Sequence, residues 1–280
     1  MRQGNGACMM NFPAYSVLLS VCNADKPEWL SIALDSMLNQ TIKPDEIVIV
    51  LNGPLDESLC AAINRYKEEK PGVFKILPLP CNMSLGSVIR QGMIACSNGF
   101  VAYTDADGYS APSRIEEEFE ALFVNKADFV GANVNEFSES VDNIACCCVF
   151  PESPEEIYRF AKRKMPMAFS SALLKKRMVL ACFDYEDCIM AEDYALFIDL
   201  LSFCAKGYNV QKPLVYKRLS EDCYKDRGSW EYVRAMRRFN EKFFKRGWFR
   251  YRDYFFRSMV NEIVFMMPRF VKTFVYDKVL

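Results

Sequence analysis

The chain has 280 residues, of which 51% are hydrophobic and 25% are charged, the balance of a folded globular protein rather than a disordered one. Its 35 basic and 36 acidic residues nearly cancel, so no overall basic field is present to bind nucleic acid, and nucleic acid is not an expected partner. The absence of histidine excludes Ser-His-Asp and Cys-His nucleophiles, histidine-ligated zinc and an imidazole base.

Residues 1–13 are predicted to be a flexible leader that precedes the first buried strand. Gly4, Gly6, Asn11 and Pro13 interrupt this stretch, and the apolar run that follows is too short for a secretory signal. No later apolar run is long enough to cross a bilayer. The 12 cysteines lack the paired spacings of a zinc site, and we expect reduced thiols in a cytoplasmic protein.

From residue 16 to residue 104, β-rich runs alternate with amphipathic helical patterns. The run EIVIVL at 46–51 is almost continuously β-branched, which is typical of a parallel strand buried on both faces. Strands separated by helices of this length indicate βαβ units around a mostly parallel sheet, an α/β fold. The predicted strands are 16–21, 46–51, 73–77 and 100–104, and the predicted helices are 27–40, 56–70 and 84–96.

The pattern is less regular in the second half of the chain, and it changes again near residue 220. Further strands are expected at 128–134 and 144–150, and further helices at 154–164 and 192–206. From residue 229 the chain has the pattern of successive helices rich in basic and aromatic residues. We therefore expect a C-terminal helical region after the α/β domain.

In parallel α/β sheets, ligands bind beyond the carboxyl ends of the strands. This rule directs attention to the turns Ser20–Asn23, Asn52–Pro54 and Asp105–Gly108. The third turn contains Asp105 and Asp107, whose spacing suits a hard divalent cation, Mg²⁺ or Mn²⁺, that can bridge a nucleotide diphosphate. An Asp-Gly turn after a strand is also ordinary, so the residues alone leave both interpretations open.

Several motifs occur in a specific order along the chain. SVLLSVCN, DEIVIVLNGP, NMSLGSVIRQG and GFVAYTDADGYSAPSR are followed by FAKRKMP, AEDYALFIDLL and CYKDRG. In order and spacing, the motifs between residue 15 and about residue 220 resemble the family 2 glycosyltransferases of GT-A fold. The later motifs look like the subgroup that builds bacterial capsule, exopolysaccharide and lipopolysaccharide chains.

The resemblance implies a Rossmann-like, three-layer GT-A fold with a C-terminal helical appendage. The catalytic domain would span 14–220, with a nucleotide-sugar half at about 14–110 and an acceptor half at about 111–220. A phosphate-covering loop and the helical region would follow at 221–280. The implied activity is inverting, metal-dependent transfer of a sugar from a nucleotide diphosphate sugar, with UDP as the expected nucleotide, to a hydroxyl of a glycan or lipid-linked acceptor.

The resemblance also implies roles for two acidic pairs. Asp105 and Asp107 would hold the Mg²⁺ or Mn²⁺ ion. Glu192 and Asp193 match the family's ED motif, in which the second carboxylate deprotonates the acceptor hydroxyl. Acidic residues at a helix start are also ordinary capping choices, but in a chain without histidine a carboxylate is the most available base.

Donor binding is implied for five further residues. Ser20 and Asn23 lie where the family's nucleotide pocket begins. The neighbouring Asp25 and Lys26 could help, although surface charge is the commoner explanation. Arg90 matches a segment behind the nucleotide and could reach a phosphate, although an exposed helical arginine fits as well. Lys225 and Arg227 resemble a segment that grips the diphosphate, and a hydrophilic linker is the alternative.

The chain departs from the family pattern at three places, and one of them is Gly108, where relatives often extend the acidic turn with another acid. Relatives usually carry an acidic residue after the second strand, where this chain has Leu51, Asn52 and Gly53. Leucine cannot accept a hydrogen bond, so recognition of the base would fall to Asn52 or to the backbone. Phe169 stands where the subgroup commonly has histidine, which points to a different selection of sugar or acceptor.

Residues 242–275 interleave basic residues with aromatic rings. This composition suits a helix on an anionic membrane surface, which would place the protein peripherally on the inner face of the cell membrane. Packing of the aromatic stripe against the catalytic domain explains the same pattern, and the two can coexist on different faces of a helix.

Two other classes of function remain as alternatives. A sugar nucleotidyltransferase uses a related α/β scaffold, but it generally needs a glycine-rich N-terminal loop that SVCNADKPEW lacks. A catalytically degenerate GT-A scaffold protein of a polysaccharide assembly is the other alternative, because fold alone does not fix function.

Overall fold

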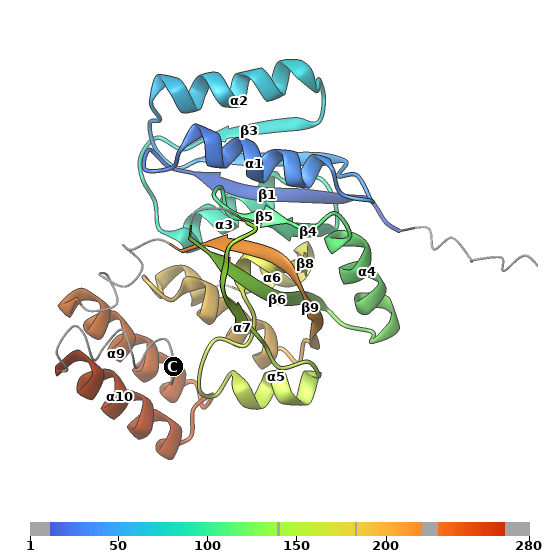
Figure 1. Cartoon of the computed structure of the whole chain (residues 1–280). Coiled ribbons are helices and arrows are strands. Elements are labelled where there is room, and N and C mark those ends of the chain that lie inside the picture. The colour runs from blue at the N-terminus through green and yellow to red at the C-terminus, as the bar shows by residue number, and fades with distance from the viewer. Residues whose placement is uncertain (1–11, 139–140, 183, 220–228, 267–280) are drawn as a thin grey trace, which may run out of the picture.

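The structure is a computed structural model that describes residues 12–138, 141–182, 184–219 and 229–266. A central sheet lies between helices, and the C-terminal helices lie together at one side of it (Figure 1). The strands are β1 (Tyr15–Val21), β2 (Glu46–Leu51), β3 (Phe74–Pro78), β4 (Phe100–Tyr103), β5 (Tyr109–Ser110), β6 (Phe129–Phe137), β7 (Ile144–Cys148), β8 (Leu173–Lys175) and β9 (Gly207–Arg218). The helices are α1 (Pro27–Leu38), α2 (Glu57–Glu69), α3 (Leu85–Ala95), α4 (Arg114–Val124), α5 (Pro154–Phe160), α6 (Lys176–Ala181), α7 (Glu192–Ser202), α9 (Trp230–Lys245) and α10 (Tyr251–Met266), with 3-10 turns η1 (Phe169–Ser171) and η2 (Asp184–Asp187).

The sheet has the order β3-β2-β1-β4-β8-β6-β9-β5, and β7 pairs with β6 outside this path. β1 pairs in parallel with β2 and β4, and β2 pairs in parallel with β3. The predicted strands of the first half and the α/β fold are therefore confirmed. Beyond β4 the sheet is mixed, because β8 runs antiparallel to β4 and β6, and β5 runs antiparallel to β9.

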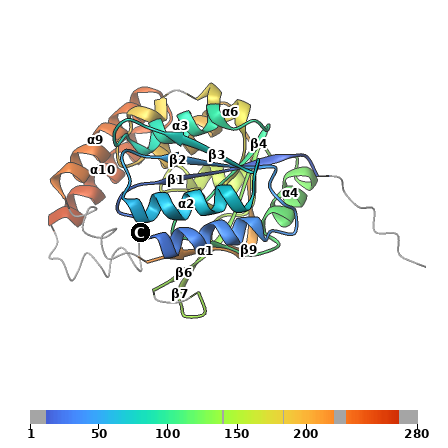
Figure 2. The same cartoon turned by 90° about the horizontal axis from the view of Figure 1, so that it is seen from above.

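Successive side chains of β1 enter two separate cores. Val17 and Leu19 pack in the core that α1, α2 and α4 cover, whereas Leu18 packs in the core that α3 and α7 cover. Figure 2 shows α1 and α2 on one side of the sheet and α3 and α6 on the other. Because β2 is covered on both faces, Ile47 and Val48 are both fully buried, which explains its β-branched run.

The strand register brings the carboxyl ends of β1, β2 and β4 to one edge of the sheet. Val21 lies beside Leu51 in β2, and Leu18 lies beside Tyr103 in β4. The turns that follow these three strands therefore meet, as expected for ligand-binding turns of a parallel sheet.

The C-terminal helices do not stand apart from the α/β region. Met236, Phe239 and Phe243 of α9 belong to the same core as α3 and α7. The aromatic stripe of α9 thus packs against the rest of the chain. On α10, Phe255 and Phe256 remain 57% and 60% exposed.

α4, which was not among the predicted helices, begins with a buried arginine that ties it to the sheet. Arg114 is fully buried, and its Nε lies 2.9 Å from Oε1 of the equally buried Glu118. Nη1 donates to the Ser110 hydroxyl at 2.9 Å, and Nη2 donates to the Tyr103 carbonyl at 2.8 Å. One guanidinium therefore joins the end of β4, β5 and α4 behind the turn that carries Asp105.

Replacing Arg114 with methionine should lower the free energy of unfolding by about 3–5 kcal/mol, because it leaves the Glu118 carboxylate buried without its partner. Urea unfolding followed by circular dichroism measures this loss. Arg65→Met is the matched control, because it also breaks an i,i+4 ion pair, with Glu69. That pair is more than half exposed, so its loss should lower the free energy of unfolding by less than about 1 kcal/mol. Equal midpoints for the two variants would contradict the structural role of Arg114.

Candidate active site

The acidic turn between β4 and β5 lies at the carboxyl edge of the sheet. Asp105 and Asp107 are both partly buried there. Burial raises the pKa of Asp107 to about 6; the negative charge of Asp105 adds to the shift, and the ammonium of Lys217 on β9 opposes it. The two carboxylates are thus close enough to repel one another, and a cation between them would relieve that repulsion.

A third carboxylate approaches the same turn from the loop after β1. Oδ2 of Asp25 accepts a hydrogen bond from the backbone N–H of Cys22 at 2.7 Å. The pKa of Asp25 is raised chiefly by burial, with a contribution from the charge of Asp105. The sequence left Asp25 among the charges beside the expected nucleotide pocket, for which a place on the surface is the commoner explanation. Its place directly after a strand of the parallel sheet was the available signal.

Tyr103, the last residue of β4, connects the acidic turn with the other expected site residues. Its side chain is buried, and burial is the main reason why its pKa is raised. The charges of Asp105 and Asp193 raise this pKa further, whereas hydrogen bonding with Ser20 lowers it. Tyr103 is therefore hydrogen-bonded to Ser20 and lies within electrostatic reach of Asp105 and Asp193, although these residues come from three separate segments of the chain.

The two acidic residues at the start of α7 differ in burial: Glu192 is buried, and Asp193 is partly exposed. Glu192 is only 5% exposed, and burial raises its pKa. Asp193 is less buried, and one of its carboxylate oxygens accepts a hydrogen bond from the Tyr194 N–H at 2.7 Å. A Cβ at Gly86 of α3 would lie 2.7 Å from the Glu186 Cα of η2 and 3.2 Å from the Glu192 side chain, so a glycine is needed where α3 passes η2 and the start of α7.

Asparagine side chains in the turns after β1 and β2 form hydrogen bonds with the backbone of neighbouring segments. Asn23 accepts a hydrogen bond from the backbone N–H of Asp56, the N-cap of α2, at 2.8 Å. Asn52 donates to the Met83 carbonyl at 3.1 Å and accepts from the Met83 N–H at 2.7 Å. The Asn52 amide keeps one further lone pair and one N–H, which is the capacity left to recognise a base.

Arg90 lies on α3 and contacts the segment that precedes α7. Its Nη1 donates to the Cys182 carbonyl at 3.2 Å, and its Nε lies 3.3 Å from Oε1 of Glu186. In this structure Arg90 therefore holds η2 in place, and its contact with a phosphate stays a prediction. Lys225 and Arg227 lie outside the described residues.

Phe169, which stands at the position where the subgroup commonly has histidine, lies against the site phenol. Its ring centroid is 4.3 Å from that of Tyr103 and 6.0 Å from that of Phe197 on α7. An apolar ring here covers one side of the Tyr103 side chain. Phenylalanine at this position therefore makes the wall beside Tyr103 apolar.

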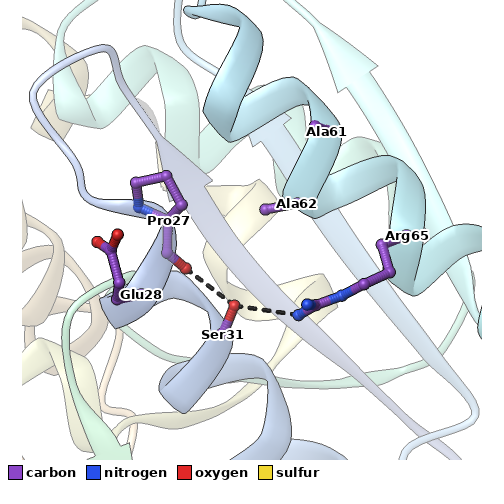
Figure 3. A pocket seen from close by; sticks show the side chains of 6 residues that line it. All are labelled: Pro27, Glu28, Ser31, Ala61, Ala62 and Arg65. Carbon is purple, nitrogen blue, oxygen red and sulfur yellow. Dashed lines mark hydrogen bonds between the residues drawn. The ribbon is translucent and has the colours of Figure 1, made fainter.

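A separate pocket between α1 and α2 contains none of the acidic residues of the site (Figure 3). Two of its polar side chains are engaged with the pocket wall: Arg65 donates to the Ser31 hydroxyl at 3.4 Å, and Ser31 donates to the Pro27 carbonyl at 2.9 Å. The carboxyl edge of the sheet is thus the better candidate for chemistry, because it gathers the carboxylates of Asp25, Asp105 and Asp107. Oxygen ligands of this kind suit Mg²⁺ or Mn²⁺, with Asp105 and Asp107 as the residues that could hold the ion.

Comparisons with known proteins agree with this architecture. The sequence model described as "Glycosyl transferase family 2" matches residues 16–181. The amylovoran biosynthesis glycosyltransferase AmsE of Erwinia amylovora is 30% identical over 268 residues, which cover 94% of this chain and 98% of that protein. A UDP-Gal:alpha-D-GlcNAc-diphosphoundecaprenol beta-1,3-galactosyltransferase of Escherichia coli is 26% identical over 96% of this chain and 97% of its own.

Among solved structures, TarS of S. aureus (residues 1–349) superposes with a TM-score of 0.58 at 16% identity, over 77% of this chain. This chain spans 63% of that TarS chain. TarS has also been solved in complex with UDP and with UDP-GlcNAc. At this level of identity the superposition establishes a shared fold, and the GT-A fold expected from the motifs is confirmed.

The raised pKa of Asp107 predicts that its carboxylate lowers the free energy of unfolding of the metal-free protein, by an amount that depends on pH. The folded pKa of this carboxyl group is about 6, above its unfolded value of 3.8. Its ionisation therefore lowers the free energy of unfolding by the full amount above pH 6, and this loss disappears below about pH 4. In EDTA, Asp107→Asn should therefore raise the free energy of unfolding by about 1–2 kcal/mol at pH 7.5, less than the full shift because the side chain is partly exposed.

Urea unfolding at pH 7.5 and at pH 4 checks this expectation. Asp187→Asn serves as the control, because Asp187 is an exposed carboxylate of η2, and it should change neither midpoint. A variant at Asp107 that is no more stable than the parent at pH 7.5 would show that burial and the charge of Asp105 do not raise the pKa of Asp107 in the folded protein.

Proposed function

The chain belongs to glycosyl transferase family 2, and from that membership we propose that it is an inverting, metal-dependent enzyme that uses a UDP-sugar. The acceptor would be a hydroxyl of a glycan or of a lipid-linked saccharide in bacterial surface polysaccharide synthesis. Support comes from relatives matched over nearly their whole length, one named for amylovoran biosynthesis and one for galactosyl transfer from UDP-Gal to a diphosphoundecaprenol-linked sugar.

The observation that carries the proposal is the convergence of Asp105 and Asp193 on Tyr103. A donor diphosphate placed at the acidic turn would bring its sugar toward the start of α7. An ion held by Asp105 and Asp107 would supply positive charge to the leaving diphosphate. The carboxylates of this turn would then bind and orient the donor without themselves taking part in proton transfer.

Asp193 would act on the acceptor. Its carboxylate takes the proton of the acceptor hydroxyl while that oxygen forms a bond to the anomeric carbon. The bond from the anomeric carbon to the diphosphate oxygen breaks, and the nucleoside diphosphate leaves with the electron pair. Attack from the face opposite the leaving group inverts the anomeric configuration, and this geometry requires the base and the diphosphate to lie on opposite sides of the sugar.

Recognition of the uracil base would fall to the turn after β2. Asn52 is fixed by its two hydrogen bonds with the Met83 backbone. The remaining N–H and the remaining oxygen lone pair of its amide are therefore already oriented for hydrogen bonds with a base. Gly53 has φ +85°, and a side chain there would approach Oδ1 of Asn82 to 2.3 Å. The glycine thus permits a tight turn that a residue with a side chain could not adopt without strain.

α10 offers a surface for a membrane that carries the lipid-linked acceptor. Tyr251, Phe255 and Phe256 are 69%, 57% and 60% exposed, and Arg250 and Arg252 beside them are also exposed. Exposed rings next to cations suit the boundary between headgroups and acyl chains of an anionic bilayer. No helix within the described part of the chain is long and apolar enough to span a membrane.

The catalytic proposal predicts different outcomes for the two acidic sites. Asp107→Asn should abolish both sugar transfer and the Mn²⁺-dependent thermal shift caused by the donor. Asp193→Asn should lower kcat by about 10²–10⁴-fold, the range for loss of a general base, and leave the donor-induced shift unchanged. The measurement is a thermal-shift panel of UDP-, GDP-, dTDP- and CMP-sugars with and without Mn²⁺, followed by nucleotide-release assays with the donor that binds.

Asp187→Asn, which alters an exposed carboxylate close in sequence to Asp193, should behave as the parent in both assays. Normal turnover by the Asp193 variant would rule out its role as base. A donor that binds equally well in EDTA would rule out metal dependence. If no nucleotide-sugar stabilises the protein under either condition, the proposal of a donor-binding enzyme fails as a whole.

The membrane proposal is tested with phosphatidylglycerol vesicles. Replacing both Phe255 and Phe256 with serine should lower the vesicle partition coefficient at least about tenfold, because two rings lose their burial in the bilayer. Phe123→Ser on α4 is the control, since Phe123 is 43% exposed and α4 lies at the other side of the molecule (Figure 1). Equal losses for both variants, or no binding by the parent chain, would contradict the proposal.

A further inference from the structure

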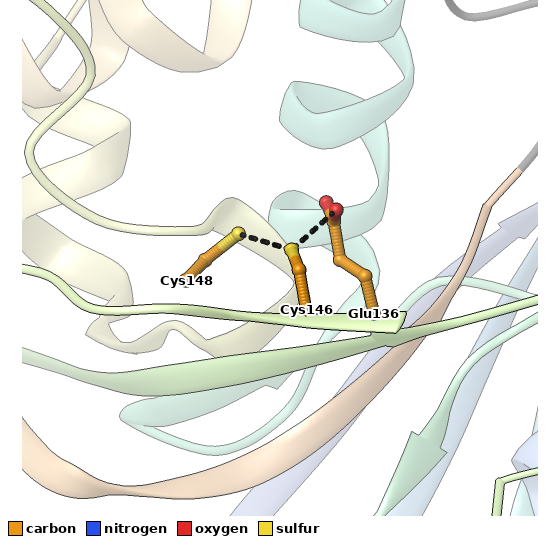
Figure 4. Close-up of side chains that lie close together, drawn as sticks. All are labelled: Glu136, Cys146 and Cys148. Carbon is orange, nitrogen blue, oxygen red and sulfur yellow. Dashed lines mark hydrogen bonds between the residues drawn. The ribbon is translucent and has the colours of Figure 1, made fainter. Parts of the chain in front are cut away.

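The hairpin formed by β6 and β7 gathers two thiols and a carboxylate on one face. β7 runs antiparallel to β6, and their register places Cys146 directly opposite Glu136 and Cys148 opposite Val134. Side chains two residues apart in a strand point to the same face, so Cys148 joins Cys146 and Glu136, whereas Cys147 points to the other face. Figure 4 shows the three side chains converging from the ribbon.

The distances within this group match those between ligands of a tetrahedral zinc ion. The Cys146 and Cys148 sulfurs are 3.9 Å apart, and the Cys146 sulfur lies 3.3 Å from Oε2 of Glu136. Zinc bonds of about 2.3 Å to sulfur and about 2.0 Å to oxygen, at tetrahedral angles, separate two sulfurs by about 3.8 Å and a sulfur from an oxygen by about 3.5 Å. All three ligand atoms lie within 4.8 Å of one another.

We propose that Glu136, Cys146 and Cys148 form a binding site for Zn²⁺ or a similar thiophilic divalent ion, with water as the fourth ligand. Two thiolates and one carboxylate supply ligands of the type that zinc prefers. The acidic turn at Asp105 offers oxygen atoms only, which suit Mg²⁺ or Mn²⁺. The two sites therefore differ in the chemistry of the ion that each selects.

A disulfide between the same cysteines is less well accommodated. Residues two apart in an extended strand have Cα atoms about 6.6 Å apart, near the upper limit for a disulfide, and the sulfurs would have to close to about 2.05 Å. Burial, together with the neighbouring Glu136 carboxylate, raises the pKa of Cys146 to about 12. Zinc would therefore have to displace the thiol protons on binding, and its affinity should fall as pH falls.

The position of the hairpin gives such an ion a structural role. β7 contacts the sheet through β6, and the hairpin projects from the body of the molecule (Figure 2). A register shift lies beside Glu136, where β6 passes to Phe137. An ion that joins Glu136 to Cys146 and Cys148 would fix this irregular register. Glu136 also lies beside Lys217 of β9, the cation that faces Asp107, so the fixed hairpin would border the acidic turn.

Co²⁺ substitution under a non-chelating phosphine reductant tests the proposal on the full chain, with excess Mg²⁺ present to fill oxygen-only sites. The parent protein should bind one Co²⁺ with a sulfur-to-cobalt charge-transfer band and the visible bands of a tetrahedral ion, and Zn²⁺ should displace it. Cys146→Ser and Cys148→Ser should each remove the charge-transfer intensity and weaken Zn²⁺ binding at least about tenfold. Glu136→Gln should weaken binding and retain the sulfur bands.

Cys147→Ser is the matched control, because Cys147 is an exposed neighbour on the opposite face of the same strand, and it should leave the spectrum unchanged. A Cys147 variant that loses the bands as the other two do would place the ion elsewhere among the thiols and overturn the proposal. Unchanged spectra in the Cys146 variant, or a parent protein that shows no sulfur-to-cobalt band, would also overturn it. None of these readings depends on transferase activity, so the outcome is independent of the proposed function.

Discussion

The buried guanidinium of Arg114 is the contact on which the acidic turn depends. It donates to the Tyr103 carbonyl at the end of β4 and to the Ser110 hydroxyl in β5, and it pairs with Glu118. The turn that carries Asp105 and Asp107 lies between the first two of these anchors. Since a buried charge without partners is costly, Arg114 cannot leave this position without strongly destabilising the fold. A rigid turn is what a site for a small cation requires.

Further polar groups extend this support toward α1. Gln40 donates to the Ala111 carbonyl at 2.8 Å and accepts from the Ile115 N–H at 3.1 Å, while the Ser36 hydroxyl accepts from the Ser110 N–H at 3.1 Å. Helices α1 and α4 are thus bonded to the same short stretch of backbone. Behind the turn lie the neutral groups of Gln40, Ser36 and Ser110 and the buried Arg114–Glu118 ion pair, whereas the turn itself carries Asp105 and Asp107. The repulsion among these carboxylates is the cost that a bound cation would offset.

The sequence predicted the parts of the fold that repeat a simple pattern. β1 to β4 and the helices between them were predicted because burial on both faces of a parallel sheet leaves continuous apolar runs. β9 was not predicted, since its middle residues Gln211, Lys212 and Pro213 are polar or break the pattern. α4 was not predicted either, and Arg114 and Glu118 have the spacing of an ordinary surface ion pair. Only the structure shows that this pair is buried while the similarly spaced Arg65 and Glu69 are exposed.

The candidate site was predictable where its residues follow strands and not where they depend on tertiary contacts. Asp105, Asp107 and Ser20 could be named from the ends of predicted strands. Lys217 could not, because it lies on the strand that sequence analysis missed. The group at Glu136 was also beyond sequence reasoning, since it joins a residue of one strand to two of another and forms no paired motif along the chain.

The C-terminal helices hold α7, the helix that begins with the candidate base. Arg257 of α10 donates to the hydroxyl of Tyr194 at 2.9 Å, and Tyr194 is the residue after Asp193. Arg246, which follows α9, pairs with Asp199 of α7 at 2.6 Å. The start of α7 is therefore fixed by the sheet on one side and by α9 and α10 on the other. If the exposed rings of α10 rest on a bilayer, the contact between Arg257 and Tyr194 would connect that surface with Asp193, the proposed base. Such a connection would put the proposed acceptor activation at the membrane side of the molecule, where a lipid-linked acceptor would arrive.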